Sequence, residues 1–292
     1  MRHIRCTTLA WAAGLALFVS SSHTVPGALA LDTLDPLFSV SGNLSVDAAG
    51  DVNNDGTPDV ISGDSSAGGS FRGKAWVTSG ADGTNLYTFE PPPGMTLAFL
   101  GHSVAGIDDL NGDDHADVVV SMYAENTVFI YSGFDGEVLE TLKQDSGGFG
   151  FTLANAGDVN NDDINDLIVG DQHGRAFLYS GADRSLLHTW ETGESEVAVD
   201  GAGDVNRDGH DDIILGLSHH SRIDRNRGRI EVYSGSDYRR IYAFDGGRQD
   251  EFFGHDVDTA GDLNFDGHAD FIAGSLYAGV VRVYSGIDGD EL

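Results

Sequence analysis

Residues 49–61 have the sequence AGDVNNDGTPDVI, and variants of this stretch recur four more times along the 292-residue chain. Successive copies begin 46 to 58 residues apart. Self-similarity at such a period indicates a repeat architecture, in which one supersecondary unit is stacked several times. The copies are centred on residues 51–59, 109–117, 158–166, 204–212 and 262–270.

Each copy leads into a short apolar run rich in β-branched residues, such as residues 118–120 (Val-Val-Val). A second, alternating run usually ends in Tyr-Ser-Gly, as in residues 128–133, and an outer run such as residues 186–190 follows a turn. A further short run, often opened by Phe-Gly as at 149–150, precedes the next copy. Four strands in roughly fifty residues, repeated radially, predict an all-β fold: a β-propeller of about five four-stranded blades over residues 31–292.

The two ends of the chain predict how the ring closes. Residues 284–292 stop where the last outer strand should begin, and residues 37–40 (Leu-Phe-Ser-Val) resemble the outer strand at 86–89. We expect this N-terminal strand to complete the fifth blade, which removes exposed sheet edges. The alternatives are a fragment and an open array that oligomerises.

Residues 1–30 have the layout of a secretory signal peptide. Arg2 and Arg5 precede an apolar run at 9–19, and residues 28–30 (Ala-Leu-Ala) form a cleavage site. The apolar run is about half the length of a membrane span. Cys6 is the only cysteine, so the mature chain would be exported without disulfides and without a membrane span. The predicted destination is the extracellular space or the cell surface, with the periplasm as the alternative.

The chain is strongly acidic. Its formal charge is −31, and without Arg2 and Arg5 of the signal peptide it is −33. Such a chain repels nucleic acid. The hydrophobic content of 40% argues against wholesale disorder, so we expect the acids to be paired with cations.

The repeated loops predict calcium binding, with up to five ions. Calcium takes six to eight oxygen ligands, and positions 1, 3, 5 and 9 of each loop supply side chains while position 7 supplies its carbonyl. In chain order these positions are Asp51, Asn53, Asp55, Thr57, Asp59; Asp109, Asn111, Asp113, His115, Asp117; Asp158, Asn160, Asp162, Ile164, Asp166; Asp204, Asn206, Asp208, His210, Asp212; Asp262, Asn264, Asp266, His268, Asp270.

Position 6 of each loop needs a sharp turn. It is glycine in three loops but Asp114 and Asp163 in the other two. Aspartate tolerates left-handed geometry better than most residues, so these two loops are expected to bind more weakly.

Two alternatives to calcium propeller loops are EF-hands and solvated acidic turns without metal. An EF-hand needs a glutamate at position 12, and no copy has one there. Five loops in register, with all side-chain positions filled, favour metal binding over solvated turns.

The Asp-x-Asn-x-Asp-Gly-x-x-Asp loops, the Phe-Gly openings and the glycine-bounded strands resemble FG-GAP repeats, as in the integrin α-subunit propeller and in bacterial exported proteins. The resemblance covers residues 37–292. It implies a calcium-braced propeller with the ions between the first and second strands of each blade, and a role in adhesion or ligand binding. Integrins have seven blades, and this chain has neither an Arg-Gly-Asp sequence nor an inserted von Willebrand-type domain.

If the calcium loops serve to stabilise the fold, any ligand surface should lie on the opposite face, where connections differ from repeat to repeat. Tyr123 and Tyr277 are candidates there. The longest insertion, residues 218–229, adds four arginines: Arg222, Arg225, Arg227 and Arg229. They form either a patch that recognises an anion, such as an acidic glycan or a protein partner, or a solvated loop that offsets local charge.

Catalysis is the rival function. No nucleophile elbow, His-Glu-x-x-His pair or phosphate loop is present in the sequence. His102 and His255 each follow a glycine that opens a repeat, which suggests a structural role. We therefore expect an extracellular protein or glycan to be recognised, rather than a polysaccharide or phosphoester to be cleaved by a hydrolase or lyase. The third candidate function is that of a structural module in a surface assembly.

Overall fold

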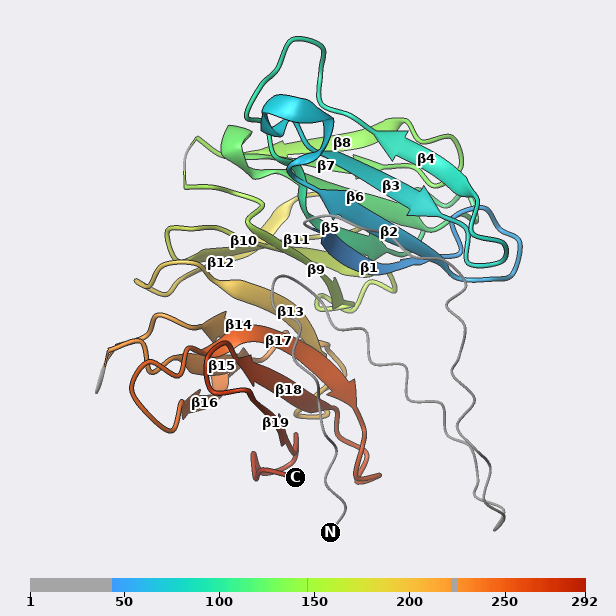
Figure 1. Ribbon diagram of the computed structural model, residues 1–292. Coiled ribbons are helices and arrows are strands. Elements are labelled where there is room, and N and C mark those ends of the chain that lie inside the picture. Colours follow the sequence, from blue (N-terminus) through green and yellow to red (C-terminus); the bar gives the residue numbers. More distant parts are fainter. Residues whose placement is uncertain (1–43, 146, 222–224) are drawn as a thin grey trace, which may run out of the picture.

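A computed structural model describes residues 44–145, 147–221 and 225–292, and there the chain forms five antiparallel sheets (Figure 1). Four of these sheets have four strands and the fifth has three. The strands of every sheet follow one another in chain order, so each sheet is a meander. This confirms the predicted all-β, propeller-like architecture of about five sheets.

The strands of the first two sheets are β1 (Leu44–Gly50), β2 (Asp59–Asp64), β3 (Lys74–Thr78), β4 (Asn85–Phe89), β5 (Leu100–Ile107), β6 (Asp117–Met122), β7 (Thr127–Tyr131) and β8 (Val138–Lys143). The third and fourth sheets contain β9 (Thr152–Gly157), β10 (Asp166–Gly170), β11 (Arg175–Tyr179), β12 (Leu186–Glu191), β13 (Ala198–Gly203), β14 (Asp212–Leu217), β15 (Arg229–Tyr233) and β16 (Arg240–Asp245). The fifth contains β17 (Phe253–Gly261), β18 (Asp270–Ser275) and β19 (Val280–Tyr284). Two short helical segments, η1 (Ala67–Phe71) and η2 (Tyr123–Glu125), lie in the β2–β3 and β6–β7 connections.

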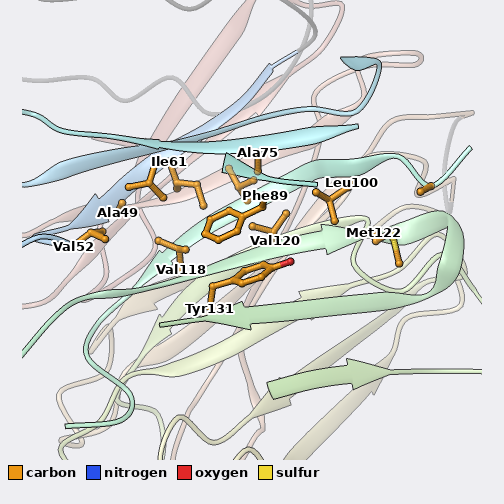
Figure 2. Packing of buried hydrophobic residues seen from close by; sticks show 13 residues of the cluster. Ala49, Val52, Ile61, Ala75, Phe89, Leu100, Val118, Val120, Met122 and Tyr131 are labelled. Carbon is orange, nitrogen blue, oxygen red and sulfur yellow. The ribbon is translucent and has the colours of Figure 1, made fainter. Parts of the chain in front are cut away.

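The core lies between neighbouring sheets, not inside any one of them. Figure 2 shows the first such interface, where Ile61 and Phe89 of the first sheet face Val118 and Tyr131 of the second. The rings of Phe89 and Tyr131 stack with their centroids 4.0 Å apart. Three further clusters join the second sheet to the third, the third to the fourth and the fourth to the fifth. The second strands are sandwiched on both faces, which explains why β6 and β14 are buried along their whole length and why their sequences are continuous apolar runs.

Among the described residues, the fifth sheet has one face that no other sheet covers with a core cluster. In the fifth sheet, Val281 lies on the face turned away from the fourth sheet and is 64% exposed. Within the described residues no core cluster joins this face to the first sheet. The predicted closing strand at 37–40 and the predicted signal peptide at 1–30 lie outside the described residues, so closure of the ring stays a prediction.

The first strands of the sheets lie innermost, because β1, β5, β9, β13 and β17 pack successively against one another. They bring together the carboxylates of Asp47, Asp200 and Asp258. Burial raises the pKa of Asp200 well above its ordinary value, and the charges of Asp258 and Asp47 raise it further. Burial likewise raises the pKa of Asp47. Ionising this cluster therefore opposes folding.

Substitution Asp200→Asn is expected to stabilise the protein in a pH-dependent way. Because the folded-state pKa of Asp200 is raised, its contribution to stability is fully present below its unfolded pKa and is lost as the pH rises through the folded pKa. The variant should gain about 1 kcal/mol or more at pH 7 and almost nothing near pH 4. Urea denaturation at the two pH values measures this difference.

The matched control is Asp237→Asn, which alters an exposed carboxylate in the β15–β16 turn. Asp47, Asp258, Asp256 and His255 are the ionisable neighbours that take part in the inner cluster. A gain of the same size at both pH values would argue against charge repulsion at Asp200.

Candidate functional site

The five acidic loops connect the first strand of each sheet to the second. Because the first strands pack side by side and each leads into an acidic loop at its carboxyl end, the loops share one face of the molecule, here called the loop face. The connections between second and third strands, and between successive sheets, lie at the other ends of the strands and form the far face.

The carboxylate at position 1 organises each loop from within. In the first loop, Asp51 accepts hydrogen bonds from the backbone N–H groups of Asp55 (3.0 Å) and Gly56 (2.8 Å). Bonds from positions 5 and 6 to position 1 recur in the other four loops. The backbone therefore wraps around this carboxylate in every copy.

Left-handed backbone allows this wrapping. Position 6 has a positive φ in all five loops, including Asp114 (68°) and Asp163 (69°), which confirms that aspartate makes the turn where glycine is missing. Position 4 is left-handed as well, a feature that sequence reasoning did not identify. Its residues are Asn54, Gly112, Asn161, Arg207 and Phe265.

The carboxylate at position 9 is buried and joins two turns of its sheet. In the fourth loop, Asp212 accepts hydrogen bonds from the N–H of Val205 within the loop and from the N–H of Gly235 in the β15–β16 turn, both at 2.9 Å. The same pair of bonds recurs at the other four position-9 aspartates, which are 0–1% exposed. Position 9 therefore fixes the acidic loop to the turn between the third and fourth strands.

The glycine that ends each Tyr-Ser-Gly segment (Thr-Ser-Gly in the first repeat) is part of this arrangement. A Cβ on Gly235 would lie 2.1 Å from the carbonyl oxygen of Asp211, and equivalent collisions occur at the other four glycines. Any side chain there would separate the turn from the loop. The sequence signal was visible as an invariant glycine within the repeat, but its link to position 9 was not predicted.

Burial shifts the titration of the position-9 carboxylates. It raises the pKa of Asp117 and Asp166 to about 6 and that of Asp212 to about 7. The backbone N–H groups partly offset this, whereas neighbouring loop carboxylates raise the pKa further. A nearby divalent cation would favour the ionised form of these groups.

The donor set of the loops fits a hard cation. Within the described residues, no three His, Cys, Asp or Glu side chains are gathered into a ready-made metal site, but the predicted ligands also include an asparagine oxygen and a carbonyl. In the third loop, the Oδ1 atom of Asn160 is buried and has no hydrogen-bond partner among the described residues. A buried acceptor normally has a partner, and a cation in the loop would supply one.

Position 7 has a role that the sequence did not predict. The Nδ1 atom of His210 lies 2.8 Å from the carbonyl oxygen of Val159 in the preceding loop. His115 and His268 make the same contact with the preceding loops, at 2.7 and 2.6 Å. Because a carbonyl only accepts, Nδ1 carries the proton. These imidazoles therefore tie neighbouring sheets together, while Thr57 and Ile164 occupy position 7 in the other two loops.

Substitution His210→Ala is expected to destabilise the protein by about 1–2 kcal/mol, since it leaves the carbonyl of a buried residue without this partner. The position-7 carbonyl proposed for the ion remains, so calcium binding should be unchanged. Chemical denaturation in calcium, beside the exposed-residue control His173→Ala, measures the effect. Equal stability of the two variants would contradict the bridge between sheets.

The far face contains most of the other residues singled out from the sequence. Tyr123 lies in η2, and Tyr277, in the β18–β19 connection, is 70% exposed and contacts the ring of Phe252. Arg225 is exposed and pairs with Asp250 at 3.2 Å. Arg222 lies outside the described residues.

Two of the four arginines are engaged within the protein. Arg229 is 9% exposed in β15 and pairs with Asp245 at 2.6 Å and with Glu231 at 3.3 Å. Arg227 donates to the carbonyls of Gly246 and Gly247. The insertion therefore does not present a patch made of all its arginines, and Arg225 is the exposed member among those described.

A group of rings on the far face was not predicted from the sequence. Tyr123 contacts Phe99, His102 and Phe151, with centroids 5.6, 4.3 and 5.8 Å away, and Phe71 stacks on Phe99. We call these five residues the ring cluster. The available signal was weak: Phe99 and Phe151 flank the segments that open the second and third sheets, and such phenylalanines are ordinarily read as core.

Comparison with known proteins finds sequence similarity to integrin alpha subunits. It is 29% identical to integrin alpha-V of Gallus gallus over 160 residues, and 31% identical to integrin alpha-11 of Homo sapiens over 127 residues. The chain is similar in sequence to integrin alpha subunits. These matches cover 46% and 38% of the chain but 15% and 11% of the two integrins, so it spans a small part of its relatives. No family model matches it.

The fold is shared with a solved chain of low sequence similarity. BBS1N, in its crystal structure in complex with ARL6DN, superposes with a TM-score of 0.53 at 12% identity, over 79% of this chain and 61% of that one. This likeness concerns the fold alone. In the part of the chain that the structure describes, no helix is long and apolar enough to cross a bilayer.

Proposed function

We propose that this protein is an exported, calcium-binding propeller that recognises an extracellular partner through its far face. The observation that carries the calcium proposal is the fivefold repetition of one loop geometry: a central position-1 carboxylate, left-handed turns at positions 4 and 6, and a buried position-9 carboxylate. In each loop, the side chains at positions 1, 3, 5 and 9 and the carbonyl at position 7 would hold the ion.

Calcium would supply positive charge and a cross-link that replaces disulfides. Five divalent ions would neutralise ten charges of a mature chain whose formal charge is −33. The protein's own contribution is to hold the loops in register, through position 9 within each sheet and through histidine bridges between sheets. The loops would thus stabilise the fold, and the far face would bind the partner.

Recognition is supported by the similarity to integrin alpha subunits and by the far face itself. Exposed apolar side chains lie on both faces: Phe71, Leu97 and Tyr277 on the far face are 51%, 55% and 70% exposed, and Phe134 and Phe265 on the loop face are 63% and 91% exposed. The far face is favoured because its connections differ from repeat to repeat, as recognition loops do. The partner would be an extracellular protein or glycan, which the proposed export signal at residues 1–30 would allow the protein to reach.

The test is to probe the immobilised chain 31–292, in calcium, with purified extracellular proteins and a glycan array, and to map any partner by hydrogen–deuterium exchange. We expect protection to concentrate in the far-face connections and the loop face to be unaffected. Turnover of a glycan or phosphoester, or protection confined to the loop face, would contradict the proposed recognition role.

A further inference from the structure

A shallow depression, open to solvent, lies on the far face beside the ring cluster. Its volume is about 270 Å³, slightly below the range of ~300–1,000 Å³ that is usual for ligand pockets. Its walls come from η2, from the β8–β9 connection and from the β10–β11 turn. The lining side chains that can interact with a ligand are Tyr123, Asn126, Asp145 and Gln172.

The aromatic wall of the pocket is the ring of Tyr123, which other rings hold in place from behind. Tyr123 lines the cavity and at the same time packs on His102, 4.3 Å away between ring centroids, and on Phe151. Phe99 and Phe71 extend this packing behind it. Both of those phenylalanines have a left-handed backbone, with φ of 52°. Bulky residues rarely adopt that conformation, and it concentrates at ligand sites, where surrounding structure maintains it.

The opposite wall is polar, and hydrogen bonds within the protein already fix the orientation of one of its side chains. Asn126 has φ of 53°, and its Oδ1 accepts hydrogen bonds from the N–H groups of Gly148 (2.8 Å) and Phe149 (3.3 Å). Its NH₂ group therefore keeps its capacity to donate. Across residues 44–145, 147–221 and 225–292, the side chains of Asp145 and Gln172 make no hydrogen bond. The pocket thus offers amide donors and acceptors together with a carboxylate.

Glycine keeps the floor of the pocket open. Gly148 has φ of 68°, and a Cβ there would lie 2.7 Å from Oε1 of Gln172. Gly147 is also left-handed, with φ of 106°. A side chain at Gly148 would displace the amide that lines the pocket, and one at Gly147 would collide with the Arg175 guanidinium beside Asp171.

We propose that this pocket binds a sugar ring of a neutral glycan, which specifies the ligand class of the recognition role proposed above and rests on it. A pyranose has an apolar C–H face that can lie on the Tyr123 ring, and its hydroxyls both donate and accept, as Asn126, Gln172 and Asp145 require. The lining contains no cationic side chain, and Arg175, which borders Gly147, is paired with Asp171 at 2.6 Å. Because Asp145 would repel a phosphate, sulfate or uronate and the chain is strongly acidic, the pocket favours neutral over anionic glycans.

The experiment is titration calorimetry of the calcium-loaded chain 31–292 with malto-, cello-, manno- and chito-oligosaccharides as probes. At least one series should bind. Tyr123→Ala should weaken that binding about tenfold or more and Gln172→Ala several-fold, because both truncate groups in direct contact with the ligand. The matched control is Phe134→Ala, which truncates a 63% exposed aromatic residue in the β7–β8 turn on the loop face, outside the pocket, and should bind within twofold of the unaltered protein.

Two further measurements keep the test decisive. The conservative variant Tyr123→Phe retains the platform and should retain most of the affinity, and thermal melting of every variant shows that a loss of binding is not a loss of folding. Absence of binding to all four series, equal binding by Tyr123→Ala, or binding only to sulfated or uronate-containing glycans would overturn the proposal. If a protein partner were then mapped elsewhere on the far face, the proposed recognition role would still hold, and only the role of this pocket would be wrong.

Discussion

Removal of calcium is expected to lower the melting temperature of the chain 31–292 by more than about 10 °C at neutral pH. A ligand at 100 times its Kd stabilises the folded state by about 2.7 kcal/mol for each site. For a domain of 150–250 residues, each kcal/mol shifts the melting temperature by about 2–4 °C. Filling most of five loops therefore produces a large effect, which differential scanning calorimetry in CaCl₂ and in EDTA measures directly.

The chemistry of the loops explains why the effect should be specific. Each loop gathers three aspartates at positions 1, 5 and 9, and burial already raises the pKa of Asp117, Asp166 and Asp212. Without a cation, these carboxylates repel one another. Restoring CaCl₂ in excess over EDTA should recover the melting temperature, whereas MgCl₂ should recover less, because magnesium prefers water-rich octahedral sites. A melting curve indifferent to EDTA would contradict calcium bracing.

Substitution Asp212→Ala is expected to destabilise the protein by about 2–5 kcal/mol even in EDTA. It removes the acceptor for the N–H groups of Val205 and Gly235, and each buried donor left without a partner costs about 1–3 kcal/mol. Asp212→Asn keeps one accepting oxygen and should lie between the two.

Urea denaturation in EDTA separates this structural effect from the loss of an ion. The control is Asp237→Ala, which truncates an exposed aspartate in the turn that Asp212 holds and should change stability by less than about 1 kcal/mol. If Asp212→Ala matched this control in EDTA, position 9 would have no structural role beyond any metal it binds.

The repeat allowed the architecture to be predicted because strand, loop and turn signals coincide in each copy. The apolar runs at 118–120 and 213–215 became the buried strands β6 and β14, since a strand covered on both faces needs apolar residues at every position. Position 6 was also predictable, because a left-handed turn restricts the residue type locally.

The contacts between sheets could not be predicted, since they depend on distances across the fold. Nothing in the neighbourhood of His210 indicates that its imidazole reaches the carbonyl of Val159, 51 residues away. Arg229 resembled its neighbours in a charged insertion, yet β15 begins at this residue and pairs it with Asp245 on β16. The ring cluster was missed for the same reason: Phe71, Phe99 and Phe151 come from three separate connections.

The central claim is that the five acidic loops bind calcium. It is tested most directly by equilibrium dialysis of the chain 31–292, stripped with EDTA and then titrated with calcium, to determine the number of ions bound per chain. We expect saturation at five ions, one for each loop. A folded chain that binds no calcium at millimolar concentration would contradict it.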